Sequence, residues 1–154
     1  MKVKLIAVGK TKESYLQQGV EEYVKRLTRY ADFEIIIVPE GKTTDSNQAK
    51  QKEGEAILAK LDKTDHLVLL DNRGKQYTSE GFANYIDTKA ANGTKTLVFC
   101  IGGAFGFSDK VYDRKNEWLS LSEMTFSHQM IRLFFVEQVY RAYTIIKGHP
   151  YHNE

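Results

Sequence analysis

The C-terminal stretch of the chain, residues 119–152, reads LSLSEMTFSHQMIRLFFVEQVYRAYTIIKGHPYH and decides the fold. It opens with a short apolar run, continues through a loop of small and polar residues, and enters a long helix near His128. At about 100° per residue, one face of this helix collects the apolar residues Ile131, Phe134, Phe135, Val139, Ala142, Ile145 and Ile146. So wide an apolar face predicts burial on nearly all sides. We expect a second copy of the chain to cover part of the helix at 129–146, with Phe135 at the contact.

Charged residues interrupt this helix at two places. Glu137 and Arg141 form an i,i+4 pair of opposite charge on the narrow polar stripe. Arg132 lies in the middle of the apolar face, where an unpaired arginine is rarely buried. Two environments for Arg132 are therefore open: it extends to water from the first helical turn, or it faces an anionic ligand or a carboxylate of a partner chain.

Length and composition place the chain among ordinary globular proteins. Its 154 residues predict one domain, residues 1–154, with a sizeable core. No apolar run approaches the roughly 20 residues that span a membrane, and the N-terminus has no signal-peptide pattern. The single cysteine, Cys100, lies in an apolar run and fits a reducing cytoplasm. A net charge of +2 argues against binding DNA or other nucleic acid by charge alone.

Strand and helix patterns alternate along the whole chain. Apolar runs predict strands at 3–9, 33–38, 66–71, 96–101 and 118–121. Helical patterns occur at 13–30, 48–61, 79–91, 108–115 and from near 128, with Asp45 or Ser46 as a cap of the second helix and a turn at 72–75. This order predicts an α/β fold with a mostly parallel sheet of five to six strands and helices on both faces.

Ligands of such sheets bind beyond the carboxyl ends of the strands. The informative ends here are Leu70-Asp71, Ile101-Gly102-Gly103 and Leu121-Ser122, all in the second half of the chain. Gly102-Gly103 lets the backbone approach a ligand closely. The spacing is neither a dinucleotide fingerprint nor a P-loop, and no G-x-S-x-G elbow of a hydrolase is present. His149 and His152 lack a third ligand nearby, so we expect no metal.

Several segments together resemble one enzyme family. They are AVGK at the start, EYVKRL, KEGEAIL, IGGAFGFS, the segment from Leu119 to Tyr143 and the terminal HPYH. With these motifs the chain resembles the SPOUT class of methyltransferases, and within it the ribosomal large-subunit pseudouridine methyltransferase H family. One position departs from the family pattern: Ser127 precedes His128, where many members have proline.

The resemblance implies a trefoil knot in the C-terminal half, a homodimer and S-adenosylmethionine as methyl donor without a metal. It also implies N3-methylation of a pseudouridine in 23S rRNA of the assembled ribosome. We expect the ribosome and not free rRNA to be the substrate, because a chain of this size and charge has no separate RNA-binding module. We expect Gly103→Val to abolish donor binding and to leave the fold intact. By position, the donor would contact Leu70, Gly102, Gly103, Leu121, Ser122, Glu123, Met124, Thr125 and Phe126.

Methyl transfer to N3 requires positioning of the reactants and removal of the N3 proton. Candidates for stabilising the anionic base or taking its proton are Arg132, Arg141, His128, Tyr151 and His152. We expect Arg132→Met to lower turnover and to preserve the dimer. We also expect the tail after Gly148 to present the pseudouridine, because Gly148 ends the helix and Pro150 stiffens the last residues. The alternative for the tail is a frayed terminus.

Two other functions remain open at this point. A related SPOUT enzyme would methylate tRNA, although the chain has no added tRNA-binding domain. Alternatively, a protein of the same fold would bind the ribosome without catalysis. Calorimetry with the donor separates the non-catalytic protein from both enzymes, and mapping of the methylated nucleotide separates the two enzymes.

Overall fold

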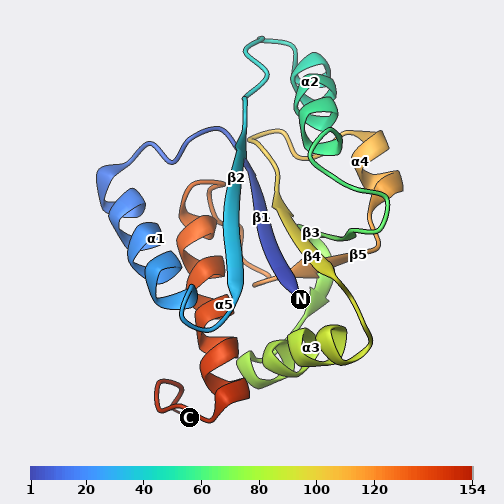
Figure 1. The fold of residues 1–154 in the computed structure, drawn as a ribbon. Coiled ribbons are helices and arrows are strands. Elements are labelled where there is room, and N and C mark those ends of the chain that lie inside the picture. The colour runs from blue at the N-terminus through green and yellow to red at the C-terminus, as the bar shows by residue number, and fades with distance from the viewer. Residues whose placement is uncertain (154) are drawn as a thin grey trace.

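The computed structural model describes residues 1–153 and contains five strands alternating with five helices (Figure 1). The first half comprises β1 (Lys2–Val8), α1 (Ser14–Leu27), β2 (Asp32–Val38), α2 (Ser46–Leu58) and β3 (His66–Gln76). The second half comprises α3 (Ser79–Ala91), β4 (Thr96–Ile101), α4 (Asp109–Arg114), β5 (Glu117–Ser120) and α5 (Met130–Lys147). The predicted order of elements is confirmed throughout.

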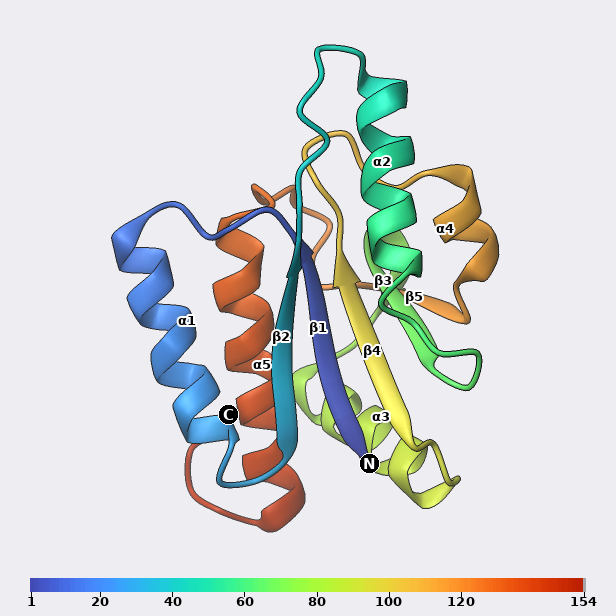
Figure 2. The same cartoon turned by 45° about the horizontal axis from the view of Figure 1, so that its top comes forward.

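All five strands lie parallel in one sheet, in the order β2-β1-β4-β3-β5. Helices α1, α3 and α5 cover one face of this sheet, and α2 and α4 cover the other (Figures 1 and 2). The predicted α/β class and parallel sheet are therefore confirmed, with five strands. The carboxyl ends of parallel strands meet at one end of the sheet, where Leu70-Asp71 of β3 and the segments after β4 and β5 come together.

Alternating residues of each strand build two separate apolar cores. In β1, Leu5 packs in the core beneath α1, α3 and α5, while its neighbour Ile6 packs in the core beneath α2 and α4. Cys100 is fully buried in the second core and carries a free thiol whose pKa is raised by burial. The prediction that Cys100 is a core residue is confirmed.

Local sequence explains where two helices begin and one ends. The Asp45 side chain accepts hydrogen bonds from Asn47 N and Gln48 N, which confirms it as a cap of α2. Thr78 caps α3 by accepting from Gly81 N at 3.0 Å. Gly148 ends α5 in the left-handed conformation, with φ of 67°, as its position in the sequence predicts.

The strand β3 differs from its prediction, because it continues to Gln76 after an irregular excursion between Leu70 and Lys75. Both of these residues pair with Leu119 of β5. A Cβ at Gly74 would lie 2.5 Å from backbone N and C of Leu119, so only glycine lets the chain cross β5 this closely. Residues 72–75 are thus a crossing over β5. The trefoil knot stays a prediction of the resemblance.

The apolar face of α5 divides into a buried and an exposed part. Phe135 is 0% exposed and packs against Phe99 with ring centroids 4.8 Å apart. Phe134 is 42% exposed and Met130 is 37% exposed. The placement of Phe135 at a contact between two copies was wrong, because the sheet of the same chain already covers it. The surface left open on α5 includes Phe134 and Met130.

Candidate active site

A cavity of about 380 Å³ lies at the carboxyl ends of β3, β4 and β5. Eight of the nine residues predicted to contact a ligand line it: Leu70, Gly102, Gly103, Leu121, Ser122, Met124, Thr125 and Phe126. Glu123 is not among its lining residues, while His128 and Ile131 are. The structure therefore brings the strand ends and the 121–128 loop together around one space, as the parallel sheet predicts.

The glycine turn forms the floor of this cavity. A Cβ at Gly102 would lie 3.2 Å from the Phe107 ring and 3.4 Å from backbone C of Gly106. A Cβ at Gly103 would lie 2.5 Å from Oε1 of Glu53. A side chain at either position would therefore displace its neighbours.

Glu53 of α2 supports the turn from below, and the sequence interpretation missed it. Its side chain is 5% exposed, and Oε2 accepts a hydrogen bond from Gly41 N at 3.3 Å. Oε1 has no hydrogen-bond partner among the described residues. Burial raises the pKa of this carboxyl. The available signal was a glutamate next to Gly54 on the buried side of a helix.

Serine hydroxyls shape the loop between β5 and α5. Ser120 Oγ donates to Ser122 O at 2.8 Å, and Ser122 Oγ accepts from Met124 N at 3.0 Å. Ser127 Oγ accepts from Met130 N at 3.0 Å, at the start of α5. The serine that departs from the family pattern therefore gives the first backbone N–H of α5 a side-chain acceptor, which proline lacks.

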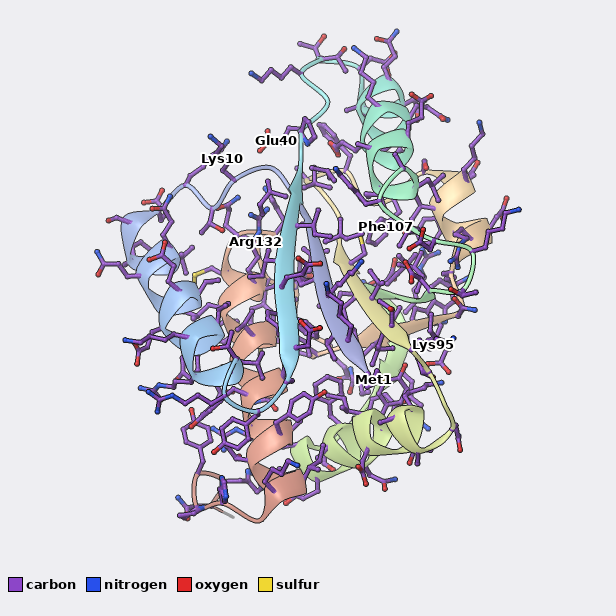
Figure 3. The ribbon with its side chains drawn as sticks, in the orientation of Figure 1. Met1, Lys10, Glu40, Lys95, Phe107 and Arg132 are labelled. Atoms are coloured by element: carbon purple, nitrogen blue, oxygen red, sulfur yellow. The ribbon has the colours of Figure 1, made fainter. Side chains whose placement is uncertain are left out.

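Arg132 fastens the start of α5 to the end of β1. It is 2% exposed and donates to Val8 O and Gly9 O at 2.6 Å each, and to Thr11 Oγ1 at 3.2 Å. Its Nε donates to His128 O at 2.9 Å. Figure 3 places Arg132 at the same end of the sheet as Lys10 and Glu40. The expectation that Arg132 extends to water was wrong, because the side chain is buried and donates to backbone carbonyls and to Thr11. The expectation of an anionic ligand or a partner's carboxylate stays a prediction.

His128 lies against the cavity, beside this anchor. Burial lowers the pKa of its imidazole, and the charge of Arg132 lowers it further. His128 is therefore neutral at pH 7 and has a ring nitrogen able to accept a proton.

The terminal residues dock onto α1, α3 and α5. Tyr151 Oη donates to Glu137 Oε1 at 2.9 Å and lies 3.2 Å from Tyr23 Oη. His152 Nδ1 lies 3.1 Å from Arg141 Nη1, and its Nε2 lies 2.8 Å from Glu80 Oε1. The alternative of a frayed terminus was wrong for residues 149–152, because His149, Tyr151 and His152 all have side-chain partners. We call Glu137, Arg141, Tyr151 and His152 the tail network.

Glu137 connects this network to a second cavity of about 300 Å³. Arg141 Nη2 donates to Glu137 Oε1 at 2.6 Å, which confirms the predicted i,i+4 pair. The second cavity shares Phe126 and residues 119–122 with the first. Within one chain, the structure thus places His128 at the first cavity and Glu137 at the second, whereas Arg141, Tyr151 and His152 are not among the lining residues of either.

Asp71 and Asn72 form the rim of the first cavity on the β3 side. Asp71 accepts from Arg73 Nε at 3.0 Å, Arg73 Nη2 at 3.1 Å and Tyr112 Oη at 2.8 Å. The Arg73 guanidinium lowers the pKa of Asp71 to about 2. This clamp fixes the excursion of β3 next to the cavity.

Two further findings concern residues 1–153 only. No group of three or more histidine, cysteine, aspartate or glutamate side chains is arranged to hold a metal ion there. None of the helices in that range combines the length and the apolar character needed to cross a membrane.

Comparison with known proteins agrees with this geometry. The family model described as "Predicted SPOUT methyltransferase" matches residues 1–152. The chain is 49% identical over 157 residues to a protein of Flavobacterium johnsoniae, covering 100% of both chains. It is 50% identical to proteins of Christiangramia forsetii, covering 99% of both, and Bacteroides thetaiotaomicron, covering 100% of both. All three relatives are named "Ribosomal RNA large subunit methyltransferase H".

Proposed function

We propose a substrate and a mechanism from one premise: the chain belongs to the SPOUT methyltransferase family. The chain methylates N3 of a pseudouridine in 23S rRNA of the assembled ribosome, with S-adenosylmethionine as donor. The names of the relatives support ribosomal RNA of the large subunit as the substrate. The compartment of action is then the cytoplasm, where ribosomes are found.

The cavity at the strand ends suits the donor. S-adenosylmethionine combines an adenine ring, hydroxyl groups and a methyl group on a positively charged sulfur, which makes that methyl electrophilic. Apolar groups of Leu70, Leu121 and Phe126 line the cavity together with the bare backbone of Gly102 and Gly103. Apolar surface with a few backbone donors and acceptors is typical of sites for such ligands. This lining is the observation that carries the proposal.

The chain's own residues then handle the N3 proton. N3 must lose its proton as the new N–C bond forms and the S–C bond breaks. A neutral His128 on the cavity wall and the carboxylate of Glu137 at the adjoining cavity are the two groups placed to accept it. Arg141, held by Glu137, would stabilise the negative charge that develops on the base.

Arg132 supports this chemistry indirectly, through the backbone that it holds. Its hydrogen bond to His128 O fixes the backbone that carries the imidazole, and its bonds to β1 fix the start of α5. We therefore assign Arg132 to positioning and keep Arg141, His128, Tyr151 and His152 as the candidates for contact with the nucleotide.

The proposal includes a homodimer formed through α5. The exposed Phe134 contacts Phe126 of the donor loop, with ring centroids 5.1 Å apart. A partner chain seated here would close the cavity against water and bring its own tail to it. Phe134→Asp should convert the dimer to a folded monomer in light scattering, while Phe135→Asp should unfold the chain. A wild-type monomer at micromolar concentration contradicts the dimer.

Two measurements test the function itself. Isothermal calorimetry should detect binding of S-adenosylmethionine without added metal. A protein that binds the ribosome without catalysis would not need to bind this donor. Mass spectrometry of 23S rRNA, after incubation with ribosomes that lack the modification, should locate one methyl group on a pseudouridine. Transfer to tRNA, or equal rates on protein-free rRNA and ribosomes, would contradict the proposed substrate.

A further inference from the structure

Cations lie over aromatic rings along one surface beyond the first cavity. The Arg73 guanidinium lies 4.9 Å from the ring centroids of both Tyr112 and Trp118. Lys115 Nζ lies 4.5 Å from the ring of Trp118. These three contacts share Arg73 and Trp118, so the cations and rings form one connected cluster.

The same surface continues along the returning part of β3. Lys75 Nζ lies 5.0 Å from the ring centroid of Tyr77. We define the cation strip as the three cations and three rings that make these contacts: Arg73, Lys75, Tyr77, Tyr112, Lys115 and Trp118.

Nearby carboxylates neutralise only part of the positive charge of the cation strip. Arg73 is paired with Asp71, yet the side chain of Arg73 is 57% exposed and that of Asp71 only 10%. Within residues 1–153, neither Lys75 nor Lys115 takes part in an ion pair, and Lys115 Nζ donates to Tyr112 O at 3.1 Å. Two lysine charges are therefore available to an anionic partner.

A structural explanation of these lysines is weaker here. Lysines often protect the open edge of a sheet from pairing with another chain. Lys75 pairs with Leu119 of β5, the last strand of the sheet, so the lysines do lie near an edge. However, the lysines also lie over aromatic rings, an arrangement that edge protection does not require.

The location of the strip points to its ligand. Asp71 lies on the rim of the first cavity, and its carboxylate holds the Arg73 guanidinium through two hydrogen bonds. A ligand bound at Arg73 therefore lies next to Asp71, on the rim of the proposed donor cavity. Phosphate groups pair with lysine and arginine, while exposed bases stack on aromatic rings.

We propose that the cation strip binds the sugar-phosphate backbone of the substrate RNA next to the target nucleotide, an inference that rests on the proposed function. The two lysines contact phosphates, and Arg73 and the rings under it offer a surface for a neighbouring base. Because the strip belongs to the chain that forms the first cavity, each protomer of a dimer would bring its own RNA contact to its own donor.

The first experiment measures methylation kinetics on ribosomes that lack the modification, at several KCl concentrations. The Lys75→Gln/Lys115→Gln variant should raise KM about tenfold and reduce the slope of log(kcat/KM) against log[KCl] by about 1–2, since each phosphate contact contributes about 0.7–0.9. Its kcat and its affinity for S-adenosylmethionine should change less than twofold. The matched control is Lys60→Gln/Lys63→Gln, which removes the same charge from exposed lysines ahead of β3.

The second experiment uses Trp118, the only tryptophan of the chain. Polyuridylate adds no tryptophan fluorescence of its own, and its binding on the strip should quench the fluorescence of Trp118. The quenching should weaken with added KCl, persist in the Lys60/Lys63 control and disappear in the Lys75/Lys115 variant. This measurement needs neither donor nor turnover.

The outcomes separate the inference from the function. If the Lys75/Lys115 variant and its control had equal KM values and salt slopes, the strip would not bind RNA, and the proposed methyltransferase function would be unaffected. A raised KM with an unchanged salt slope would assign the surface to a ribosomal protein and overturn the RNA contact. A wild-type protein that quenches with polyuridylate but methylates no ribosome would refute the proposed function and support the strip.

Discussion

The two ends of α5 use arginine in opposite ways. At the first end, Arg132 is 2% exposed and donates only to neutral oxygen atoms, three of them backbone carbonyls. At the other end, the half-buried Arg141 donates to the carboxylate of Glu137 and lies beside His152. A buried guanidinium saturated by carbonyls holds a fold together. For the half-buried Arg141, paired with a carboxylate beside the docked tail, we propose a contact with the substrate instead.

The largest expected effect is a loss of stability when the buried arginine, Arg132, is replaced. Arg132→Met leaves Val8 O, Gly9 O and His128 O without their donor, and each unsatisfied buried group costs about 1–3 kcal/mol. We expect the free energy of unfolding to fall by several kcal/mol in urea titrations. The expectation from the sequence, that this variant keeps its structure and loses only turnover, is therefore revised.

The matched control is Arg141→Met on the same helix. A partly exposed ion pair contributes about 0–1 kcal/mol, so this variant should fold nearly as well as the wild type and lose turnover on ribosomes. If both variants unfolded alike, the assignment of different tasks to the two arginines would fail.

The next largest effect concerns the tail. Deleting residues 149–154 removes the partners of Glu137 and Arg141, and we expect turnover on ribosomes to fall by orders of magnitude. Donor affinity should change less than about tenfold, or about 1.4 kcal/mol. Single-turnover methylation and calorimetry measure the two quantities separately. Full activity after truncation would show that docking of the tail serves stability alone.

The two ends of α5 also differ in how far the sequence could predict them. Periodicity gave the helix, its Glu137–Arg141 pair and its end at Gly148, because these depend on residues within a few turns. The environment of Arg132 could not be predicted, because three of its four partners lie 121–124 positions away, at the end of β1 and in the loop that follows it. Phe135 was misplaced for the same reason, since helical spacing cannot tell which neighbour covers a face.

The strand ends that line the cavity could be predicted from the sequence better than the residues that hold them in place. The carboxyl ends of parallel strands meet at one edge whatever the details, so Leu70, Gly102 and Leu121 could be brought together in advance. The spacing of Glu53 from Ala49 and Ile57 indicated the buried side of α2, but it could not indicate that the carboxyl lies beside Gly103. The crossing of β5 at Gly74 likewise depends on tertiary contact.

A smaller effect is expected for substitutions of the two cavity glycines, Gly102 and Gly103, near the Arg132 end of α5. Gly102→Ala brings a methyl group to 3.2 Å from the Phe107 ring, whereas Gly103→Ala meets Glu53 Oε1 at 2.5 Å. Calorimetry should report weaker binding of S-adenosylmethionine for both, by about tenfold or more for Gly103→Ala and less for Gly102→Ala. Because Glu53 is buried, Gly103→Ala should also lower stability, which revises the expectation that a larger residue at Gly103 leaves the fold intact. If both variants bound the donor as tightly as the wild type does, the donor site would not be the cavity at Gly102 and Gly103.

The smallest effect concerns acid stability at the rim of the same cavity. The Arg73 guanidinium lowers the pKa of Asp71 to about 2, below the value of about 3.9 in an unfolded chain. A carboxylate with a lowered pKa stabilises the fold above pH 4, and this contribution disappears as pH falls from about 4 to 2. Asp71→Asn should therefore lose about 1–2 kcal/mol at pH 7, after allowance for the exposure of Arg73, and almost nothing relative to the wild type at pH 2. Urea unfolding across this range measures the difference, with Asp113→Asn on the exposed side of α4 as control. A loss of stability that is the same at pH 7 and pH 2 would mean that Asp71 holds Arg73 by geometry alone, and that its charge does not fix the rim on which the donor cavity and the cation strip meet.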